Sequence, residues 1–228
     1  MKIVIATIHS WNIQEARKFI SKYPQAEVLL ITDRGHLVHD KIRKFNPDYI
    51  FFPHWSWFIP ENIYRNYECI VFHMTDLPYG RGGSPLQNLI VRGIYKTKIS
   101  AIRVVKNIDA GPVYLKEVFC LEGSASDIFV RCSKIIFTKM IPQIILRTPM
   151  PCRQSGKVVK FKRRTAKQSN IASLNSLKKV YDYIRMLDAE GYPHAYLKFG
   201  ALKVEFTDAK MSGSLLTAKA KIEVKNEK

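Results

Sequence analysis

One histidine and one aspartate stand where two apolar runs of the sequence give way to loops, and together they suggest proton-transfer chemistry. His73 ends the run Cys-Ile-Val-Phe-His and precedes the glycine-rich stretch 80–84. Asp109 follows the next predicted strand, in Asn-Ile-Asp-Ala-Gly-Pro, 36 positions later. An imidazole and a carboxylate brought together act as a base and the group that orients it. A lone histidine at such a position is more often a packed core residue, so both interpretations stay open here.

A second candidate site follows the first predicted strand. The run Thr-Ile-His-Ser-Trp-Asn leads into a helical pattern and places Ser10, Trp11 and Asn12 at a helix N-terminus. Backbone amides at such an end favour phosphate groups. Plain helix capping is the simpler explanation of Ser10 and Asn12. The chain lacks both Gly-x-Gly-x-x-Gly and Gly-x-x-x-x-Gly-Lys-Ser/Thr, which argues against dinucleotide-binding and P-loop proteins.

Alternating strand and helix patterns position these residues. Six runs rich in Val, Ile and Phe are expected as strands: 2–7, 27–32, 49–53, 69–74, 100–105 and 113–120. Helical patterns cover 12–22, 36–45 and 85–93, and Ser84 is expected to cap the last of these with Pro85 in its first position. Strands joined by crossover helices predict an α/β fold with a doubly wound, mostly parallel sheet. In such sheets ligands bind at the carboxyl ends of the strands, where both candidate sites lie.

The second half of the chain predicts a long helix and a small α+β appendage. Residues 124–146 have the pattern of a helix packed on the sheet, and a helical stripe over 177–187 precedes a hairpin over 196–206. Three parts are predicted: a catalytic domain at 1–150, a basic linker at 151–170 and an appendage at 171–228. Small hairpins at a sheet edge invite pairing between chains, so a homodimer is one expectation.

The net charge of +18 is unevenly distributed. Residues 151–228 carry 17 basic and 7 acidic side chains, and no acidic residue lies between Asp127 and Asp182. Within that gap, 157–167 is Lys-Val-Val-Lys-Phe-Lys-Arg-Arg-Thr-Ala-Lys. Such a surface attracts polyanions, so a nucleic acid or a phosphate-bearing substrate is one interpretation and a solvated linker is the other.

Composition excludes several classes of protein. With 228 residues, 46% hydrophobic and 25% charged, the chain has the make-up of a globular protein. Its longest apolar runs fall far short of the ~20 residues of a membrane span. The N-terminus lacks the pattern of a signal peptide, so we expect a cytoplasmic protein with no membrane partner. Four cysteines without a Cys-x-x-Cys pair predict reduced thiols and no metal.

The motifs around His73 and Asp109 resemble those of the 10-formyltetrahydrofolate-dependent formyltransferase family. The chain reads His-x-Thr-x-Leu-Pro-x-x-x-Gly from His73 and Asp-Ala-Gly-Pro from Asp109, and the resemblance runs through most of 1–145. That family includes glycinamide ribonucleotide transformylase, methionyl-tRNA formyltransferase and the sugar N-formyltransferases, all with a doubly wound catalytic domain. The resemblance implies transfer of a formyl group from 10-formyltetrahydrofolate, as co-substrate, to an amine.

The resemblance also implies roles for named residues. Catalysis would depend on His73, Asp109 and Thr75. The folate would contact Ser56, Trp57, Phe58, Ile59, Gly83, Val104, Ile108 and Asp109. The second substrate would contact Ser10, Trp11, Asn12, Tyr79 and Arg81.

One departure from the family concerns the oxyanion. The family usually has Asn two positions before the histidine, where its amide stabilises the developing negative charge, and here that residue is Val71. Three explanations compete. Thr75 or a backbone amide of 82–84 replaces the amide, protonated His73 acts alone, or the protein binds folate without transferring the formyl group.

The predicted amine substrate is a nucleotide-linked amino sugar. Only 78 residues follow position 150, fewer than the barrel-like tRNA-binding domain of methionyl-tRNA formyltransferases requires. The loop 73–85 resembles the branch acting on a UDP-linked 4-amino-4,6-dideoxy sugar in the pseudaminic-acid pathway. The expected partner is therefore a nucleotide sugar and not a nucleic acid. The alternatives are a methionyl-tRNA formyltransferase-like enzyme and a non-catalytic basic protein that binds nucleic acid.

Overall fold

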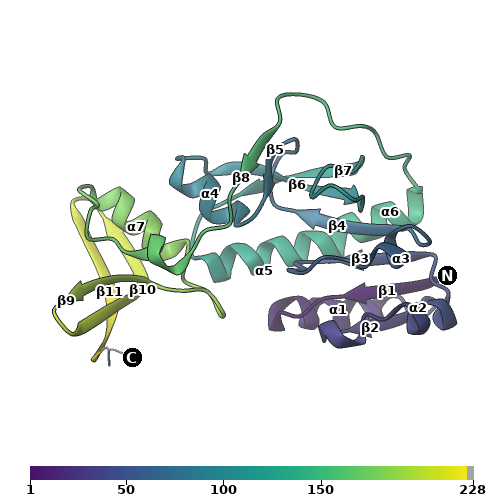
Figure 1. Cartoon of the computed structure of the whole chain (residues 1–228), viewed down its shortest axis with the longest axis horizontal. Coiled ribbons are helices and arrows are strands. Elements are labelled where there is room, and N and C mark those ends of the chain that lie inside the picture. The colour runs from purple at the N-terminus through teal and green to yellow at the C-terminus, as the bar shows by residue number, and fades with distance from the viewer. Residues whose placement is uncertain (225–228) are drawn as a thin grey trace. The chain divides into compact units, whose positions relative to one another are not determined.

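Six strands from the first half of the chain form one sheet in the computed structural model, which describes residues 1–224 (Figure 1). The strand order is β2-β1-β3-β4-β6-β7. The strands are Lys2–Ala6 (β1), Glu27–Ile31 (β2), Tyr49–Phe52 (β3), Cys69–His73 (β4), Lys96–Arg103 (β6) and Val113–Cys120 (β7). β1 pairs in parallel with β2 and β3, and β3 with β4, whereas β4 and β6 are antiparallel. The predicted α/β fold with a mostly parallel sheet is confirmed.

The central strands are apolar throughout. Ile3–Ala6 of β1 is fully buried, as are Ile50 and Phe51 of β3. Parallel strands covered on both faces have this continuous pattern, which is why the sequence predicts them well. Since β1, β3 and β4 are parallel neighbours, their carboxyl ends lie along one edge of the sheet. The loops that follow these three strands are therefore brought together.

Two compact units divide the described chain. The first comprises Met1–Gly82, Thr97–Phe119 and Phe129–Lys160, and it contains most of the six-stranded sheet. The second comprises the remaining described residues. The predicted domain boundaries at 150 and 170 stay predictions.

The helices that precede β4 in the first unit are α1 (Ser10–Lys22), η1 (Arg34–His36), α2 (His39–Phe45) and α3 (Glu61–Tyr64). α1 buries Trp11, Ala16 and Phe19 on one face, and the ring centroid of Phe19 lies 6.3 Å from that of Phe137. This contact fixes α1 to the helical segment that contains Phe137.

The long helix predicted over 124–146 contains a π-helical turn. The structure has α5 (Ala125–Ile135), η2 (Ile136–Met140, the π-helix) and α6 (Ile141–Arg147). Pro142 lacks the N–H that would bond to the carbonyl of Thr138, and its ring displaces that carbonyl, so the regular ladder widens there. No helix within residues 1–224 is long and apolar enough to cross a membrane.

The second unit contains a helix packed on an antiparallel sheet. α7 (Leu177–Arg185) contacts β10 and β11 in the sheet of order β11-β10-β9. The strands are Ala195–Phe199 (β9), Leu202–Ser212 (β10) and Leu215–Val224 (β11). The predicted hairpin is β9 and the start of β10. β11 was not predicted, although charged residues at alternate positions, Lys219, Lys221 and Glu223, give it a strand pattern.

Part of the segment predicted as a linker has regular structure. β8 (Val159–Phe161) pairs with β5 (Tyr79–Gly82) in a two-stranded sheet, and η3 (Ala166–Ser169) begins with a capping box. Ser84 is the N-cap residue of α4 (Pro85–Val91) and Pro85 is its first residue, as predicted, but the Ser84 side chain makes no capping hydrogen bond. Ser84 has a left-handed backbone, and its hydroxyl accepts the N–H of Arg164 at 3.0 Å instead.

A buried ion pair holds α7 within the second unit. Arg185 Nε donates to Asp182 Oδ1 at 2.8 Å, and Arg185 Nη1 donates to the carbonyls of Leu121 and Gly123 at 2.6 and 2.9 Å. Asp182 Oδ2 accepts from the Tyr95 hydroxyl at 2.7 Å. Each charge therefore depends on the other for its place in the interior.

We predict that Arg185→Met lowers the free energy of unfolding by about 3 kcal/mol, because the Asp182 carboxylate stays buried without its cation. Denaturant-induced unfolding followed by circular dichroism measures this change. Lys179→Met, at an exposed position of the same helix, is the control and should change stability by less than about 0.5 kcal/mol. Equal effects of the two substitutions would contradict the role of the pair.

Candidate active site

His73 and Asp109 meet at the carboxyl end of β4. His73 Nδ1 lies 3.6 Å from Asp109 Oδ2, and both side chains are largely buried. Asp109 comes from the loop between β6 and β7, and β6 is the antiparallel neighbour of β4. The two side chains are close in the fold, as expected from the sequence, although the antiparallel pairing puts the carboxyl end of β6 opposite Ile70, so the loop after β6 returns toward His73. The catalytic role of the two residues stays a prediction.

The contact made by Nε2, the second ring nitrogen of His73, shows which tautomer the neutral imidazole adopts. His73 Nε2 is 2.7 Å from the carbonyl oxygen of Gly80. A carbonyl oxygen only accepts, so Nε2 carries the hydrogen and donates it. In the neutral imidazole Nδ1 is then the basic nitrogen, and it faces the Asp109 carboxylate. This arrangement suits the removal of a proton from an amine placed beside both groups.

Asp109 has an uncommon backbone conformation. Its φ of 52° lies in the left-handed region, which costs a residue with a side chain about 1–2 kcal/mol. Its Oδ2 accepts the N–H of Gly82 at 2.8 Å. Two residues later, a Cβ on Gly111 would lie 1.7 Å from the Arg103 carbonyl oxygen. The loop is thus tightly packed around a strained aspartate.

Of the residues considered for stabilising the oxyanion, Thr75 has a hydrogen-bond donor in its side chain and Val71 has none. Thr75 is fully buried, and its hydroxyl donates to the carbonyl of Gly80 at 3.5 Å, the same oxygen that His73 contacts. Val71 is an apolar residue of β4 opposite Ile102 and offers no donor. Two predicted catalytic side chains therefore share one backbone acceptor.

Asp76, in the loop after β4, is bound by two lysines. Lys116 Nζ contacts Asp76 Oδ1 and the Leu77 carbonyl, and Lys98 Nζ lies 3.0 Å from Asp76 Oδ2. Burial alone would raise the pKa of Asp76, but the hydrogen bonds from Lys116 and Lys98 outweigh it and hold the pKa below its usual value. Asp76 thus stays ionised and attaches the loop after β4 to β6 and β7.

The predicted substrate turn opens α1. Ser10 is exposed, whereas Trp11 is buried and Asn12 is only 1% exposed. The helix cap is His9, whose side chain makes no capping hydrogen bond. Among the described residues, neither Trp11 Nε1 nor Asn12 Nδ2 has an acceptor. Buried donors without an acceptor are rare in folded proteins, and these two give the end of β1 the means to bind an acceptor group of a ligand.

A second histidine, which was not among the predicted site residues, lies beside this turn. The His54 ring follows β3 and contacts the rings of His9 and Phe129 at 4.5 and 4.8 Å between centroids. Burial, and then the proximity of His9, lowers the pKa of His54 to about 3, so it is neutral near pH 7. A polar residue directly after an apolar strand was the signal that identified His73, and it applied equally here. No group of three or more His, Cys, Asp or Glu within 1–224 is placed to hold a metal ion.

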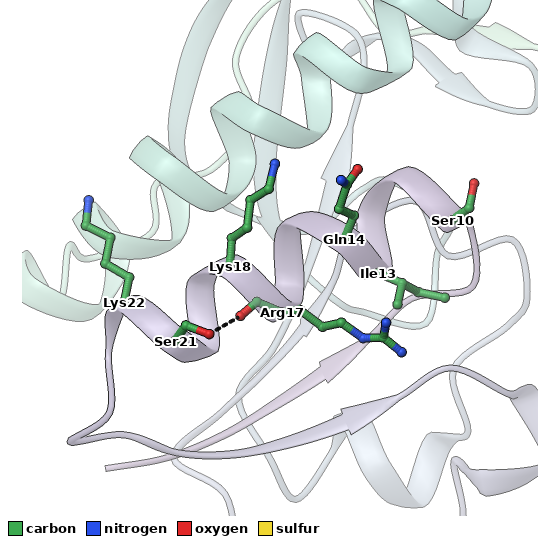
Figure 2. A pocket seen from close by; sticks show the side chains of 7 residues that line it. All are labelled: Ser10, Ile13, Gln14, Arg17, Lys18, Ser21 and Lys22. Carbon is green, nitrogen blue, oxygen red and sulfur yellow. Dashed lines mark hydrogen bonds between the residues drawn. The ribbon is translucent and has the colours of Figure 1, made fainter.

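A groove of about 820 Å³ runs along α1 from Ser10. It is lined by Ser10, Ile13, Gln14, Arg17, Lys18, Ser21 and Lys22. Figure 2 shows Gln14, Lys18 and Lys22 pointing to the same side of the helix. Lys18 pairs with Glu15 at 2.6 Å, and Arg17 and Lys22 are exposed cations. The groove therefore carries a positive charge that suits phosphate groups.

The residues predicted to line the folate differ in exposure. Ile59 and Val104 pack against the core cluster around β3. Phe58 is 83% exposed, and Trp57, Ile108 and Ser56 are also exposed. Gly83 belongs to the second unit, where its N–H donates to the Phe161 carbonyl at 3.2 Å. Exposed aromatic and aliphatic side chains offer an apolar surface on which a flat ring, such as that of a folate, can pack. The contacts of these residues with the folate stay predictions.

Tyr79 and Arg81 of β5 were predicted to contact the second substrate. Tyr79 is half-buried, and the guanidinium of Arg81 donates to Oε1 of Gln154. Gln154 was not predicted. Its neighbours are Pro, Cys, Arg, Ser and Gly, a composition typical of linkers, so no local pattern identifies it.

Comparison with known proteins gives several close similarities. A family model described as "Methionyl-tRNA formyltransferase, C-terminal domain" matches residues 166–223. The solved methionyl-tRNA formyltransferase from Clostridium thermocellum is 50% identical, with 98% of this chain and 99% of that chain covered and a TM-score of 0.97. The curated methionyl-tRNA formyltransferase of Rickettsia felis is 26% identical over 79% of this chain. The chain spans 64% of that relative's length.

Sugar N-formyltransferases are more distant. One from Shewanella is 12% identical with a TM-score of 0.68, covering 88% of this chain and 93% of that chain, so only the fold is shared. The predicted nucleotide-sugar substrate, with its pseudaminic-acid branch, is therefore wrong. The expectation that no nucleic acid takes part is wrong as well, because the similar proteins at 50% and 26% identity are named for a tRNA substrate.

We predict that Gly111→Ala destabilises the protein by about 2 kcal/mol or more, because the new Cβ meets the Arg103 carbonyl and the loop must move. Thermal or denaturant unfolding measures the change. Gly93→Ala is the comparison, since its Cβ enters open space and only its positive φ is unfavourable, by about 1 kcal/mol. A smaller loss for Gly111→Ala than for Gly93→Ala would contradict the packing argument.

Proposed function

Because this chain belongs to the methionyl-tRNA formyltransferase family, we propose that it transfers the formyl group of 10-formyltetrahydrofolate to the amine of methionyl-tRNA. The observation that carries this proposal is 50% identity to the Clostridium thermocellum protein over nearly the whole of both chains. Formyltransferases of this family use 10-formyltetrahydrofolate, in keeping with the co-substrate expected from the sequence. The products are N-formylmethionyl-tRNA and tetrahydrofolate.

The His73–Asp109 pair supplies the base in this proposal. The methionyl amine attacks the formyl carbon, a tetrahedral intermediate forms, and the bond from that carbon to N10 of the folate breaks. The amine loses a proton and N10 gains one. His73 Nδ1 and Asp109 Oδ2 lie 3.6 Å apart, so an amine placed beside them is within reach of both proton acceptors.

The oxyanion requires a donor that does not come from position 71. His73 Nε2 and the Thr75 hydroxyl both donate to the carbonyl of Gly80. To stabilise the oxyanion that forms on the formyl oxygen, His73 Nε2 or the Thr75 hydroxyl must give up its hydrogen bond to the Gly80 carbonyl and donate to the oxyanion instead. A single oxyanion donor contributes about 10²–10³ in rate, so this exchange matters to turnover.

Electrostatics support an RNA substrate. The net charge is +18, and two basic segments are exposed in part: the α1 groove with its three cations, and residues 157–167. Lysine and arginine bind RNA phosphates with release of counterions, which makes the affinity steeply dependent on salt.

We predict that Asp109→Asn lowers kcat about 10²–10⁴-fold, because an amide cannot accept the amine proton. The measurement is formation of N-formylmethionyl-tRNA from 10-formyltetrahydrofolate and methionyl-tRNA. Asp40→Asn, at an exposed position on α2, is the matched control and should retain wild-type kcat. A wild-type protein that formylates glycinamide ribonucleotide or an amino sugar, and not methionyl-tRNA, would refute the proposed substrate.

We also predict that Arg17→Ala with Lys22→Ala weakens binding of methionyl-tRNA and flattens its salt dependence. Each phosphate that the variant no longer neutralises should reduce the slope of log affinity against log salt by about 0.7–0.9. Filter binding between about 50 and 200 mM salt measures the slope. Lys41→Ala with Lys44→Ala removes the same charge from exposed positions of α2. An equal effect of the two pairs would show that only net charge matters.

A further inference from the structure

A glutamine outside the predicted site contacts the loop that carries Asp109. Gln154 lies in the part of the first unit that the sequence presents as a linker. Its near neighbour Cys152 exchanges two backbone hydrogen bonds with Val113 at the start of β7, of 2.7 and 2.8 Å. This pairing fixes the segment beside the loop between β6 and β7.

The side-chain amide of Gln154 is bonded at both ends. Its Nε2 donates to the backbone carbonyls of Asp109 and Gly111, each at 2.8 Å. Its Oε1 accepts from Nε and Nη2 of Arg81 at 3.0 and 2.7 Å. One half-buried side chain thus links the Asp109 loop to β5. The same strand supplies Gly82, whose N–H donates to the Asp109 carboxylate.

Asp109 needs support at both its backbone and its side chain. A left-handed aspartate persists only where its surroundings over-determine it. Gly82 holds the carboxylate, and Gln154 holds the backbone carbonyl of the same residue. We propose that Gln154 is a positioning residue for formyl transfer, which keeps the Asp109 carboxylate facing Nδ1 of His73. The catalytic part of this inference rests on the proposed function.

The chemistry of the contacts requires an amide. The carbonyl oxygens of Asp109 and Gly111 accept hydrogen bonds, whereas the Arg81 guanidinium donates them. The amide of a glutamine side chain provides the N–H donors and the oxygen acceptor that these partners require. Glutamate would keep the bond to Arg81 but would set a carboxylate oxygen against the carbonyls of Asp109 and Gly111. Gln154→Glu therefore breaks the contact with the loop with almost no change in size.

The first test is a double-mutant cycle on formylation of methionyl-tRNA. Gln154→Glu should lower kcat about 10–100-fold, as expected for a small displacement of a catalytic group, with both KM values within about twofold of wild type. In an Asp109→Ala background, measured at high enzyme concentration, Gln154→Glu should have no further effect. Ser155→Ala, at the exposed neighbouring position, is the control and should match wild type. An equal loss in both backgrounds overturns the inference.

The second test does not depend on activity. The amide proton of Gly82, bonded to a carboxylate, should give a downfield signal in the ¹H–¹⁵N NMR spectrum. In Gln154→Glu the chemical shift of the Gly82 amide proton should move toward the value measured in Asp109→Ala. If the glutamate variant does not fold, Gln154→Met replaces it in the test. An unchanged Gly82 signal in a folded Gln154 variant overturns the positioning of Asp109. A wild-type protein without turnover, in which the signal still depends on Gln154, refutes the proposed function and supports the positioning.

Discussion

The hydrogen bond from the N–H of Gly82 to the Asp109 carboxylate is the contact on which the candidate site depends. The oxygen that accepts it is also the one that faces His73, so a single atom links β4, β5 and the loop before β7. Two residues earlier on β5, the carbonyl of Gly80 receives His73 Nε2. One short strand therefore orients both the imidazole and the carboxylate. Glycine at positions 80 and 82 permits this, because both have positive φ.

The sequence predicts the parts of this site that follow from hydrophobic pattern. Continuous apolar runs identify the parallel strands. His73 stands out as a polar residue at the end of such a run, and Asp109 lies in the loop after the next strand. The contacts that fix them do not follow from pattern. Gln154 bonds to carbonyls more than 40 positions away, and β8 has only three residues, so neither leaves a periodic signal. His54 did leave the same signal as His73 and was passed over.

The prediction of the formyltransferase family and its formyl donor was correct, and the prediction of the amine was wrong. The amine was predicted from length, because the 78 residues that follow position 150 are fewer than a barrel-like tRNA-binding domain requires. The family model for the C-terminal domain matches only 166–223, a span that the short sheet β9–β11 and α7 occupy. Length was therefore a poor guide to the substrate. The net charge of +18, which the sequence alone leaves open between a polyanionic partner and a solvated linker, is compatible with the tRNA substrate for which the similar proteins are named.

The replacement of the usual Asn by Val71 directs attention to the carbonyl of Gly80. Val71 packs within the sheet, so the absence of the amide leaves His73 Nε2 and the Thr75 hydroxyl as the side-chain donors identified beside Asp109. Both donate to the same backbone oxygen. That oxygen thus holds the imidazole in the orientation that exposes Nδ1 to Asp109, and it competes with any oxyanion for the hydrogen on Nε2. Proton acceptance at Nδ1 is compatible with this bond, whereas donation from Nε2 to the oxyanion requires that it break. In the proposed reaction this geometry favours His73 and Asp109 as the base, and a formyl oxygen bound by His73 Nε2 or the Thr75 hydroxyl would replace the Gly80 carbonyl as the acceptor.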